Sequence, residues 1–199
     1  MITYTCSFGK KDTVFGKRDV VFSNQRLFVD PKRESGFYKT FNPLYGTTLW
    51  MDANFRLKVP LNTLKKFSKY DLVTFKAIDH DCTYIEAQAV KKLKLDNPLL
   101  VDKQMDYYKL NGFPEHYGMI ASSCLLRKDN DRVRKFNALW GKQVTTYSKR
   151  DQLSFNFCLW CMEMNGNPLK IGYFEGNWLD NPYFERRDHI WKGSVICKK

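Results

Sequence analysis

Leu49-Trp50-Met51-Asp52-Ala53-Asn54-Phe55-Arg56-Leu57 is an apolar strand that runs directly into an Asp-x-Asn pair and then returns to apolar residues. In open α/β sheets ligands bind at the carboxyl ends of strands, so an acidic residue at this point is well placed for binding. Asp52 and Asn54 offer hard oxygens two residues apart, which suit Mg²⁺ or Mn²⁺. The competing interpretation is an Asx turn that closes a hairpin, because a bare Asp-x-Asn pair is common.

Short β-type runs and helical patterns alternate on both sides of this stretch. Strands are expected at 2–8, 19–22, 47–51, 72–75 and 118–125. Helical patterns cover 60–69, 83–93, 99–111, 130–140 and 151–162. Strands that alternate with helices predict an α/β layered domain. From about residue 166 the periodicity disappears and glycine, proline, tryptophan and asparagine become frequent, which predicts an irregular C-terminal segment.

Length and composition fit one folded domain over residues 1–199. Hydrophobic residues make up 43% and aromatic residues 16%, which is enough for a sizeable core and excludes general disorder. No apolar run is long enough to span a membrane. The first nine residues lack a basic leader and a long apolar core, so no signal peptide is expected. A cytoplasmic location follows, in a bacterium or, for a viral protein, in an infected cell.

The net charge of +12 favours partners that carry phosphate, whether nucleic acid, anionic lipid or a nucleotide diphosphate. The basic residues are spread over short groups such as Lys10-Lys11 and Arg186-Arg187, and no group is as long as a basic tail. Most of these side chains are therefore interpreted as solvated surface.

Cys158 and Cys161 form a CxxC motif, one candidate for a metal site among the six cysteines. A structural zinc site needs a second cysteine or histidine pair at similar spacing, and the sequence contains none. The cysteines are therefore expected to be buried thiols in a reducing compartment.

A second segment that suggests chemistry is Tyr147-Ser148-Lys149-Arg150-Asp151-Gln152-Leu153-Ser154-Phe155. Ser148 as N-cap with Asp151 three residues later has the spacing of a capping box, so a well-capped helix is one interpretation. The functional interpretation is that Asp151 points into a cleft and handles an acceptor hydroxyl. Arg150 would then hold a phosphate or carboxylate.

A third segment is His189-Ile190-Trp191-Lys192-Gly193 near the C-terminus. Histidine can ligate a metal and lysine can neutralise a phosphate. An isolated histidine near a chain end is usually a surface residue, and this interpretation stays open. The other two histidines, His80 and His116, have no better arrangement in the sequence.

Together these segments resemble the glycosyltransferase-like domain family typified by plant mucilage and cell-wall proteins, which has bacterial and viral relatives. The matching stretches, in chain order, are 49–57, 75–76, 81–87, 112–114, 126–127, 136–140 and 148–155. Arg-Asp-Gln-Leu-Ser-Phe at 150–155 is the most specific of them. The chain departs from the family pattern at Ala77, His80 and Asp129, and in having Trp140-Gly141 in place of a tryptophan pair.

The resemblance implies a GT-A-like fold, with a Rossmann-like mixed central sheet flanked by helices. It implies a metal site of the D-x-D type formed by Asp52 and Asn54, and by analogy His189 would complete it. The residues that it implies for donor binding are Phe8, Gly9, Lys39, Asp52, Arg150 and Lys192.

The implied reaction moves a sugar from a nucleotide-diphospho-sugar to a hydroxyl of a glycan or glycoprotein. Negative charge that develops on the leaving diphosphate must be stabilised. Mn²⁺ or Mg²⁺ at Asp52 would do so as a Lewis acid, helped by lysine and arginine side chains. The candidate for taking the proton of the acceptor hydroxyl is Asp151, with Glu86 in reserve.

Two other functions remain open from the sequence. Charge and aromatic content favour a non-catalytic nucleic-acid-binding module. The absence of a helix-turn-helix, RNA-recognition or zinc-finger pattern opposes that function, so nucleic acid is not the expected partner. The other is an inactive glycosyltransferase-like domain that binds carbohydrate, because Asn54 is not an acid.

Overall fold

The structure is a computed structural model that describes residues 1–8, 13–23 and 27–189. Within these residues six strands form one sheet in the order β2-β1-β3-β6-β5-β7. They are β1 (Ile2–Cys6), β2 (Val20–Phe22), β3 (Thr48–Met51), β5 (Leu72–Lys76), β6 (Ile120–Arg127) and β7 (Ile171–Tyr173). Only β6 runs antiparallel to its neighbours in this sheet. The expected α/β fold with a mixed central sheet, consistent with a GT-A-like arrangement, is confirmed.

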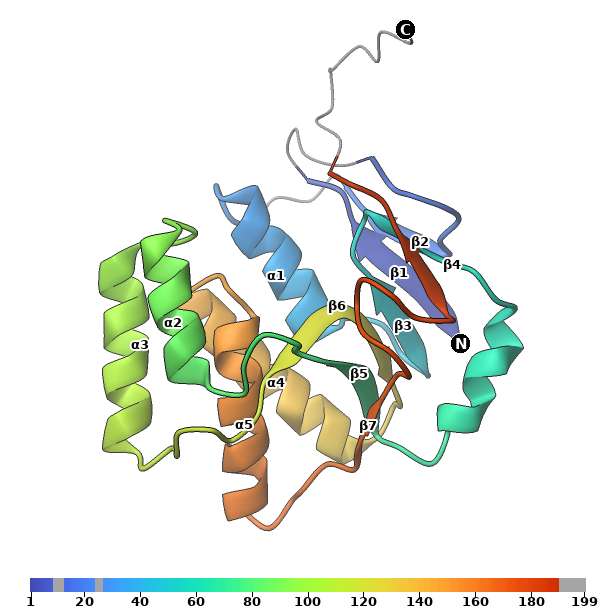
Figure 1. The fold of residues 1–199 in the computed structure, drawn as a ribbon. Coiled ribbons are helices and arrows are strands. Elements are labelled where there is room, and N and C mark those ends of the chain that lie inside the picture. Colours follow the sequence, from blue (N-terminus) through green and yellow to red (C-terminus); the bar gives the residue numbers. More distant parts are fainter. Residues whose placement is uncertain (9–12, 24–26, 190–199) are drawn as a thin grey trace, which may run out of the picture.

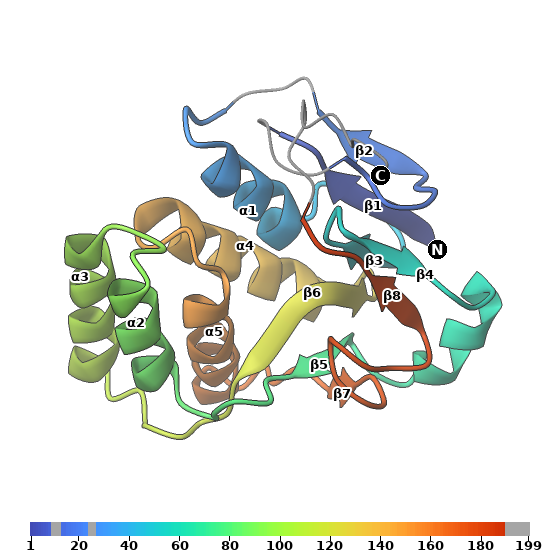
Figure 2. The same cartoon turned by 45° about the horizontal axis from the view of Figure 1, so that its top comes forward.

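Helices cover one face of this sheet, and a small second sheet covers the other (Figure 1 and Figure 2). The helices are α1 (Pro31–Phe41), α2 (Thr83–Lys92), α3 (Pro98–Leu110), α4 (Asp131–Thr146) and α5 (Gln152–Met164), with a 3₁₀ helix, η1, at Leu61–Phe67. The small sheet pairs β4 (Phe55–Leu57) with β8 (Phe184–Arg186). Strand β3 therefore lies in the middle of a layered domain.

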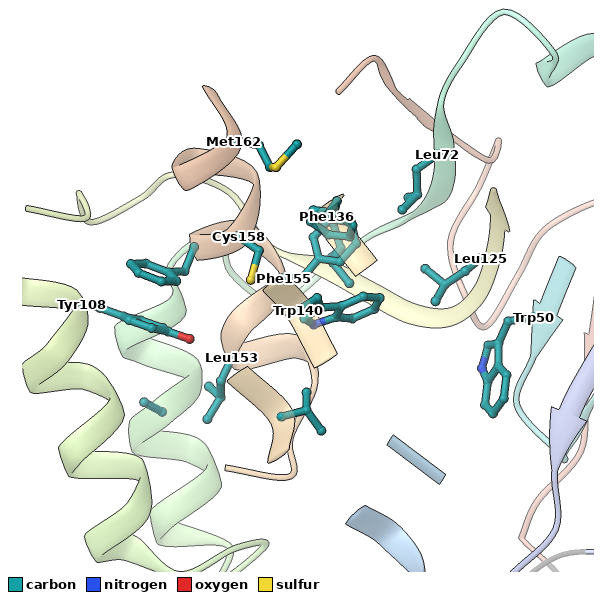
Figure 3. Packing of buried hydrophobic residues seen from close by; sticks show 14 of the residues in the cluster. Trp50, Leu72, Tyr108, Leu125, Phe136, Trp140, Leu153, Phe155, Cys158 and Met162 are labelled. Atoms are coloured by element: carbon teal, nitrogen blue, oxygen red, sulfur yellow. The ribbon is translucent and has the colours of Figure 1, made fainter. Parts of the chain in front are cut away.

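Alternating side chains of β3 enter two separate cores. Trp50 packs in the cluster on the helix side, whereas Leu49 and Met51 pack in the cluster beneath β4 and β8. Burial on both faces explains why this strand is continuously apolar. On the helix side, Trp140 and Phe155 bring α4 and α5 into edge-to-face contact (Figure 3).

The sequence patterns predict no helix at Pro31–Phe41, where α1 lies. Its glycine, serine and threonine residues lower helix propensity and obscure the pattern. The boundary signal is nevertheless present, because the Asp30 side chain accepts a hydrogen bond from the Lys32 N–H at 2.8 Å and Pro31 follows the cap. The omission matters because α1 carries Lys39 into the interior.

Helix α1 approaches α4 closely at Gly141. A Cβ built on Gly141 would lie 2.2 Å from Cδ2 of Phe41. Gly141→Ala is expected to lower the free energy of unfolding by about 1 kcal/mol, because overpacking of roughly 2 kcal/mol exceeds a gain in helix propensity of roughly 1 kcal/mol. Urea denaturation measures the change. Lys142→Ala, at the next and exposed position, is the control, and a more stable Gly141→Ala protein would contradict the prediction.

The C-terminal segment from about residue 166 is largely irregular, as expected, but it also contributes β7 and β8. These two three-residue strands are too short to show periodicity in the sequence. Residues 190–199, which include Lys192, lie outside the described residues. None of the helices in the described part of the chain is long and apolar enough to cross a membrane.

The described cysteines fit the expectation of buried thiols. Cys6, Cys82, Cys124 and Cys158 are buried, and Cys161 is half-buried. Burial raises the pKa of the Cys161 thiol to about 11, so this thiol is protonated at neutral pH.

Candidate active site

A cleft of about 390 Å³ opens where β3 and β5 end. Asp52 directly follows β3, and Ala77 directly follows β5. Between these two strands the antiparallel strand β6 brings its first half to the same edge, so Ser122 also lines the cleft. The cleft therefore lies at the carboxyl edge of the sheet, where α/β folds bind ligands.

Most residues predicted for the site line this one cleft, although they come from distant parts of the chain. They are Lys39, Asp52, Asn54, Glu86, Arg150, Asp151 and His189. Phe8 is elsewhere, with its ring 5.6 Å from that of Tyr38 at the end of β1. Gly9 and Lys192 lie outside the described residues.

Lys39 occupies the centre of the site, and its side chain is only 8% exposed. Its Nζ lies 2.7 Å from Asp151 Oδ2 and 3.4 Å from Asp52 Oδ1. It also lies 3.0 Å from Ser122 Oγ, which in turn donates to Asp151 Oδ2 at 2.8 Å. An ammonium group has three N–H donors, and three protein oxygens surround this one. Lys39 thus joins the end of β3 to the start of α5.

The ion pair changes the acidity of both partners. Burial alone would raise the pKa of Asp151, but the Lys39 charge, with smaller effects of Lys32 and the Ser122 hydroxyl, lowers that pKa to about 2. Burial alone would lower the pKa of Lys39, but Asp151 and Asp52 raise it. Asp151 is therefore ionised at neutral pH, and a carboxylate this acidic is a weak proton acceptor.

Asp52 keeps one carboxylate oxygen available for a ligand. Its Oδ1 accepts hydrogen bonds from Trp50 Nε1 at 2.8 Å and Lys39 Nζ at 3.4 Å. Among the described residues, both side-chain hydrogen bonds of Asp52 use this oxygen, and the side chain is 38% exposed. The hairpin interpretation of the Asp-x-Asn pair is wrong, because β4 pairs with β8 and not with β3.

Asn54 is buried and connects β4 to the chain that leads to His189. Its Nδ2 donates to the Arg187 carbonyl at 3.1 Å, and the Arg187 N–H donates to the Asn54 carbonyl at 3.0 Å. In the described part of the chain no cluster of three histidine, cysteine or acidic side chains is poised for a metal. Asp52, Asn54 and His189 all line the cleft and offer oxygen and nitrogen donors of the kind that a divalent ion needs, so the metal site stays a prediction.

The segment before α5 is held by several hydrogen bonds, but not by the predicted cap. The helix begins at Gln152 after Asp151, and Ser148 Oγ accepts the Arg150 N–H at 3.2 Å and donates to Asp96 Oδ2 at 2.6 Å, both before the helix starts. The prediction of Ser148 as N-cap is wrong, because the chain makes one more turn before the helix starts. Trp140 Nε1 donates to the Asp151 carbonyl at 2.9 Å, so the Phe-Asn-Ala-Leu-Trp segment of α4 helps to position Asp151.

The structure adds residues to the site that the sequence does not single out for it: Ser122, His80, Trp178 and Arg186. His80 Nε2 lies 3.1 Å from Glu86 Oε2. Its other nitrogen, Nδ1, is buried and has no hydrogen-bond partner among the described residues. The departure from the family pattern at position 80 was the one signal for His80, whereas Ser122 lies in an ordinary apolar strand and gives none.

Most of the cleft residues lie in the part of the chain that matches the model of a known family. The family model described as TOD1/MUCI70, glycosyltransferase-like domain, matches residues 4–181, from β1 to just before β8. Arg186 and His189 lie beyond the matched range. No curated protein and no solved structure matches the chain significantly. Because the match covers most of the chain and includes Asp52 and Asp151, the chain belongs to the TOD1/MUCI70 glycosyltransferase-like domain family.

Proposed function

We propose that this domain moves a sugar from a nucleotide-diphospho-sugar to a hydroxyl of a glycan or glycoprotein, with Mn²⁺ or Mg²⁺ as cofactor. Family membership supports a transferase in general terms. The observation that carries the finer proposal is the convergence of Asp52, the Lys39–Asp151 pair and His189 on one cleft at the carboxyl edge of the sheet.

Basic side chains near Asp52 support the binding of a diphosphate in the cleft. Lys32 is close enough to Asp52, Asp151 and Arg150 for their charges to influence it. Lys32 and Arg150 can therefore neutralise a diphosphate that lies over Asp52. A divalent ion held by Asp52 and His189, with Asn54 beside them, would supply Lewis-acid stabilisation to the leaving diphosphate.

Proton transfer is better assigned to Glu86 than to Asp151. Asp151 is bound to Lys39 and Ser122, and its low pKa makes it a weak base. Glu86 lines the cleft and has His80 as its partner. A carboxylate oriented by a histidine is suited to accept the proton of an acceptor hydroxyl. Asp151 then serves with Lys39 to position the donor end of the site.

The proposal is tested by thermal unfolding with Mn²⁺ and a panel of UDP-, GDP-, dTDP- and CMP-sugars. A ligand that binds the folded state stabilises it by about 2.7 kcal/mol at 100 times its Kd. We expect one nucleotide family to raise the melting temperature, and only when the metal is present. No shift with any member, together with salt-sensitive binding to DNA or RNA, would instead support the nucleic-acid-binding module.

Glu86→Gln is expected to lower the rate of transfer on the order of 100-fold, because general-base catalysis contributes about that much or more. The donor-induced shift in melting temperature should stay unchanged, since Glu86 lies away from the diphosphate in the proposed complex. Turnover with a saturating donor measures the effect. Glu115→Gln, at an exposed position outside the cleft, is the control. Full activity of Glu86→Gln would contradict this prediction and leave Asp151 as the candidate that accepts the proton of the acceptor hydroxyl.

A further inference from the structure

Side-chain hydrogen bonds order the turn between β7 and β8, which carries Trp178. Asn177 Oδ1 accepts the N–H of Asp180 at 3.0 Å, and Asn181 Oδ1 accepts the N–H of Tyr183 at 3.0 Å. Such side-chain turns replace the missing regular hydrogen bonds and order the backbone. The backbone that carries Trp178 is therefore well defined although it is irregular.

The indole ring of Trp178 is half-buried and forms part of the cleft lining. It packs against the apolar cluster beneath β4 and β8. The guanidinium carbon of Arg186 lies 5.2 Å from the ring centroid, at cation–π distance. Because these contacts restrict the ring, little conformational entropy should be lost on binding.

The same cleft is also lined by the loop from β5 to α2, which contributes Ile78, Asp79 and His80, and by Glu86 of α2. The His80–Glu86 pair and the Asp79 carboxylate provide hydrogen-bond acceptors. The buried Nδ1 of His80 has no partner among the described residues, which identifies one polar group that a ligand could satisfy.

We propose that Trp178, His80 and Glu86 form the acceptor subsite and that it takes a pyranose ring, so that the acceptor of this transferase is a carbohydrate. A pyranose combines C–H groups, which pack on an aromatic ring, with hydroxyls, which donate to carboxylate and imidazole. One aromatic side chain among a few polar groups matches such a ring better than it matches a lipid, which needs a long apolar groove. The proposal deepens the proposed function and rests on it.

The test compares Trp178→Ala and Trp178→Phe with the unaltered protein. The acceptor probes are methyl pyranosides and disaccharides of glucose, galactose, mannose and N-acetylglucosamine. For Trp178→Ala we expect an acceptor KM at least tenfold higher, with donor KM and donor hydrolysis by water within twofold of the unaltered protein. Trp178→Phe should recover most of the loss. Tyr173→Ala, an exposed aromatic outside the cleft, is the control and should change neither constant.

An unchanged acceptor KM in Trp178→Ala would overturn the proposed acceptor subsite, and so would transfer only to peptide or lipid hydroxyls. In both cases donor binding would still support a transferase. If no donor binds, the proposed function fails, and saturation-transfer NMR with the same saccharides then tests the subsite directly. Saccharide binding that disappears in Trp178→Ala would support the subsite in a carbohydrate-binding domain. Lack of binding to every saccharide would overturn it.

Discussion

Replacement of Asp52 by asparagine is expected to reduce sugar transfer on the order of 1,000-fold and to abolish the metal-dependent effect of the donor on melting temperature. Loss of an electrostatic interaction worth about 4 kcal/mol in the transition state gives a reduction of this size. The substitution removes the charge but keeps the shape of the side chain, and it leaves an oxygen that can accept from Trp50 Nε1. Initial rates at saturating donor and acceptor measure the change.

The fold should tolerate this substitution, because the Asp52 side chain is 38% exposed and Lys39 keeps its shorter contact with Asp151. The melting temperature without ligand should therefore change little. Asp81→Asn, which alters an exposed acid paired with His116 outside the cleft, is the matched control. Activity within tenfold of the unaltered protein, with the metal still required, would place the cofactor elsewhere.

Replacement of Lys39 by methionine is expected to lower the free energy of unfolding by about 3–5 kcal/mol at pH 7. Removing one partner of a buried ion pair leaves the other as an uncompensated buried charge. Asp151 is 8% exposed and would keep Ser122 but lose its ammonium partner. Urea denaturation followed by fluorescence and circular dichroism measures the change.

The loss caused by Lys39→Met should shrink in acid. The pKa of Asp151 is about 2 in the folded protein against 3.8 as the ordinary value, so ionised Asp151 contributes about 2 kcal/mol above pH 4. This contribution disappears as the pH falls from about 4 towards 2, because Asp151 then becomes protonated. The difference between the two proteins should thus be full at pH 7 and reduced near pH 3.

Lys91→Met provides the comparison for the Lys39 experiment. Lys91 pairs with Asp102 between α2 and α3, where the aspartate side chain is 50% exposed. A solvent-exposed pair contributes at most about 1 kcal/mol, so its loss should be small. A loss for Lys39→Met no larger than that for Lys91→Met, or one that does not depend on pH, would show that Lys39 does not hold the site together.

Much of the architecture could be predicted because the patterns that specify it are local. Strands β1, β2, β3, β5 and β6 and helices α2 to α5 have runs of apolar residues that identify each element. Helix α1 was not recognisable from its residues, since its polar and small residues weaken the pattern and contacts with α4 and β1 supply its stability. The strands β7 and β8 are too short to be recognised from periodicity.

In the candidate site, too, some features could be predicted from local sequence and others depend on tertiary contacts. Asp52 and Asp151 could be selected from the sequence because each lies at the boundary of a regular element within a recognisable segment. The pairing of Asp151 with Lys39 could not, because the two residues are more than a hundred positions apart in sequence and meet only when α1 packs against α4 and β1. The pairing of His80 with Glu86 likewise depends on how the β5–α2 loop folds back.

The sequence by itself determined the α/β class, the family and the acidic residues at the ends of strand and helix. These are properties of short segments, and hydrophobic spacing and turn chemistry fix them locally. Only the tertiary structure decided what each acid does. It buries Asp151 against Lys39 and leaves an oxygen of Asp52 available in the cleft. It also brings Trp178 to the same cleft. Burial and charge proximity set acidity and ligand access, and both arise from contacts between residues that are distant in sequence.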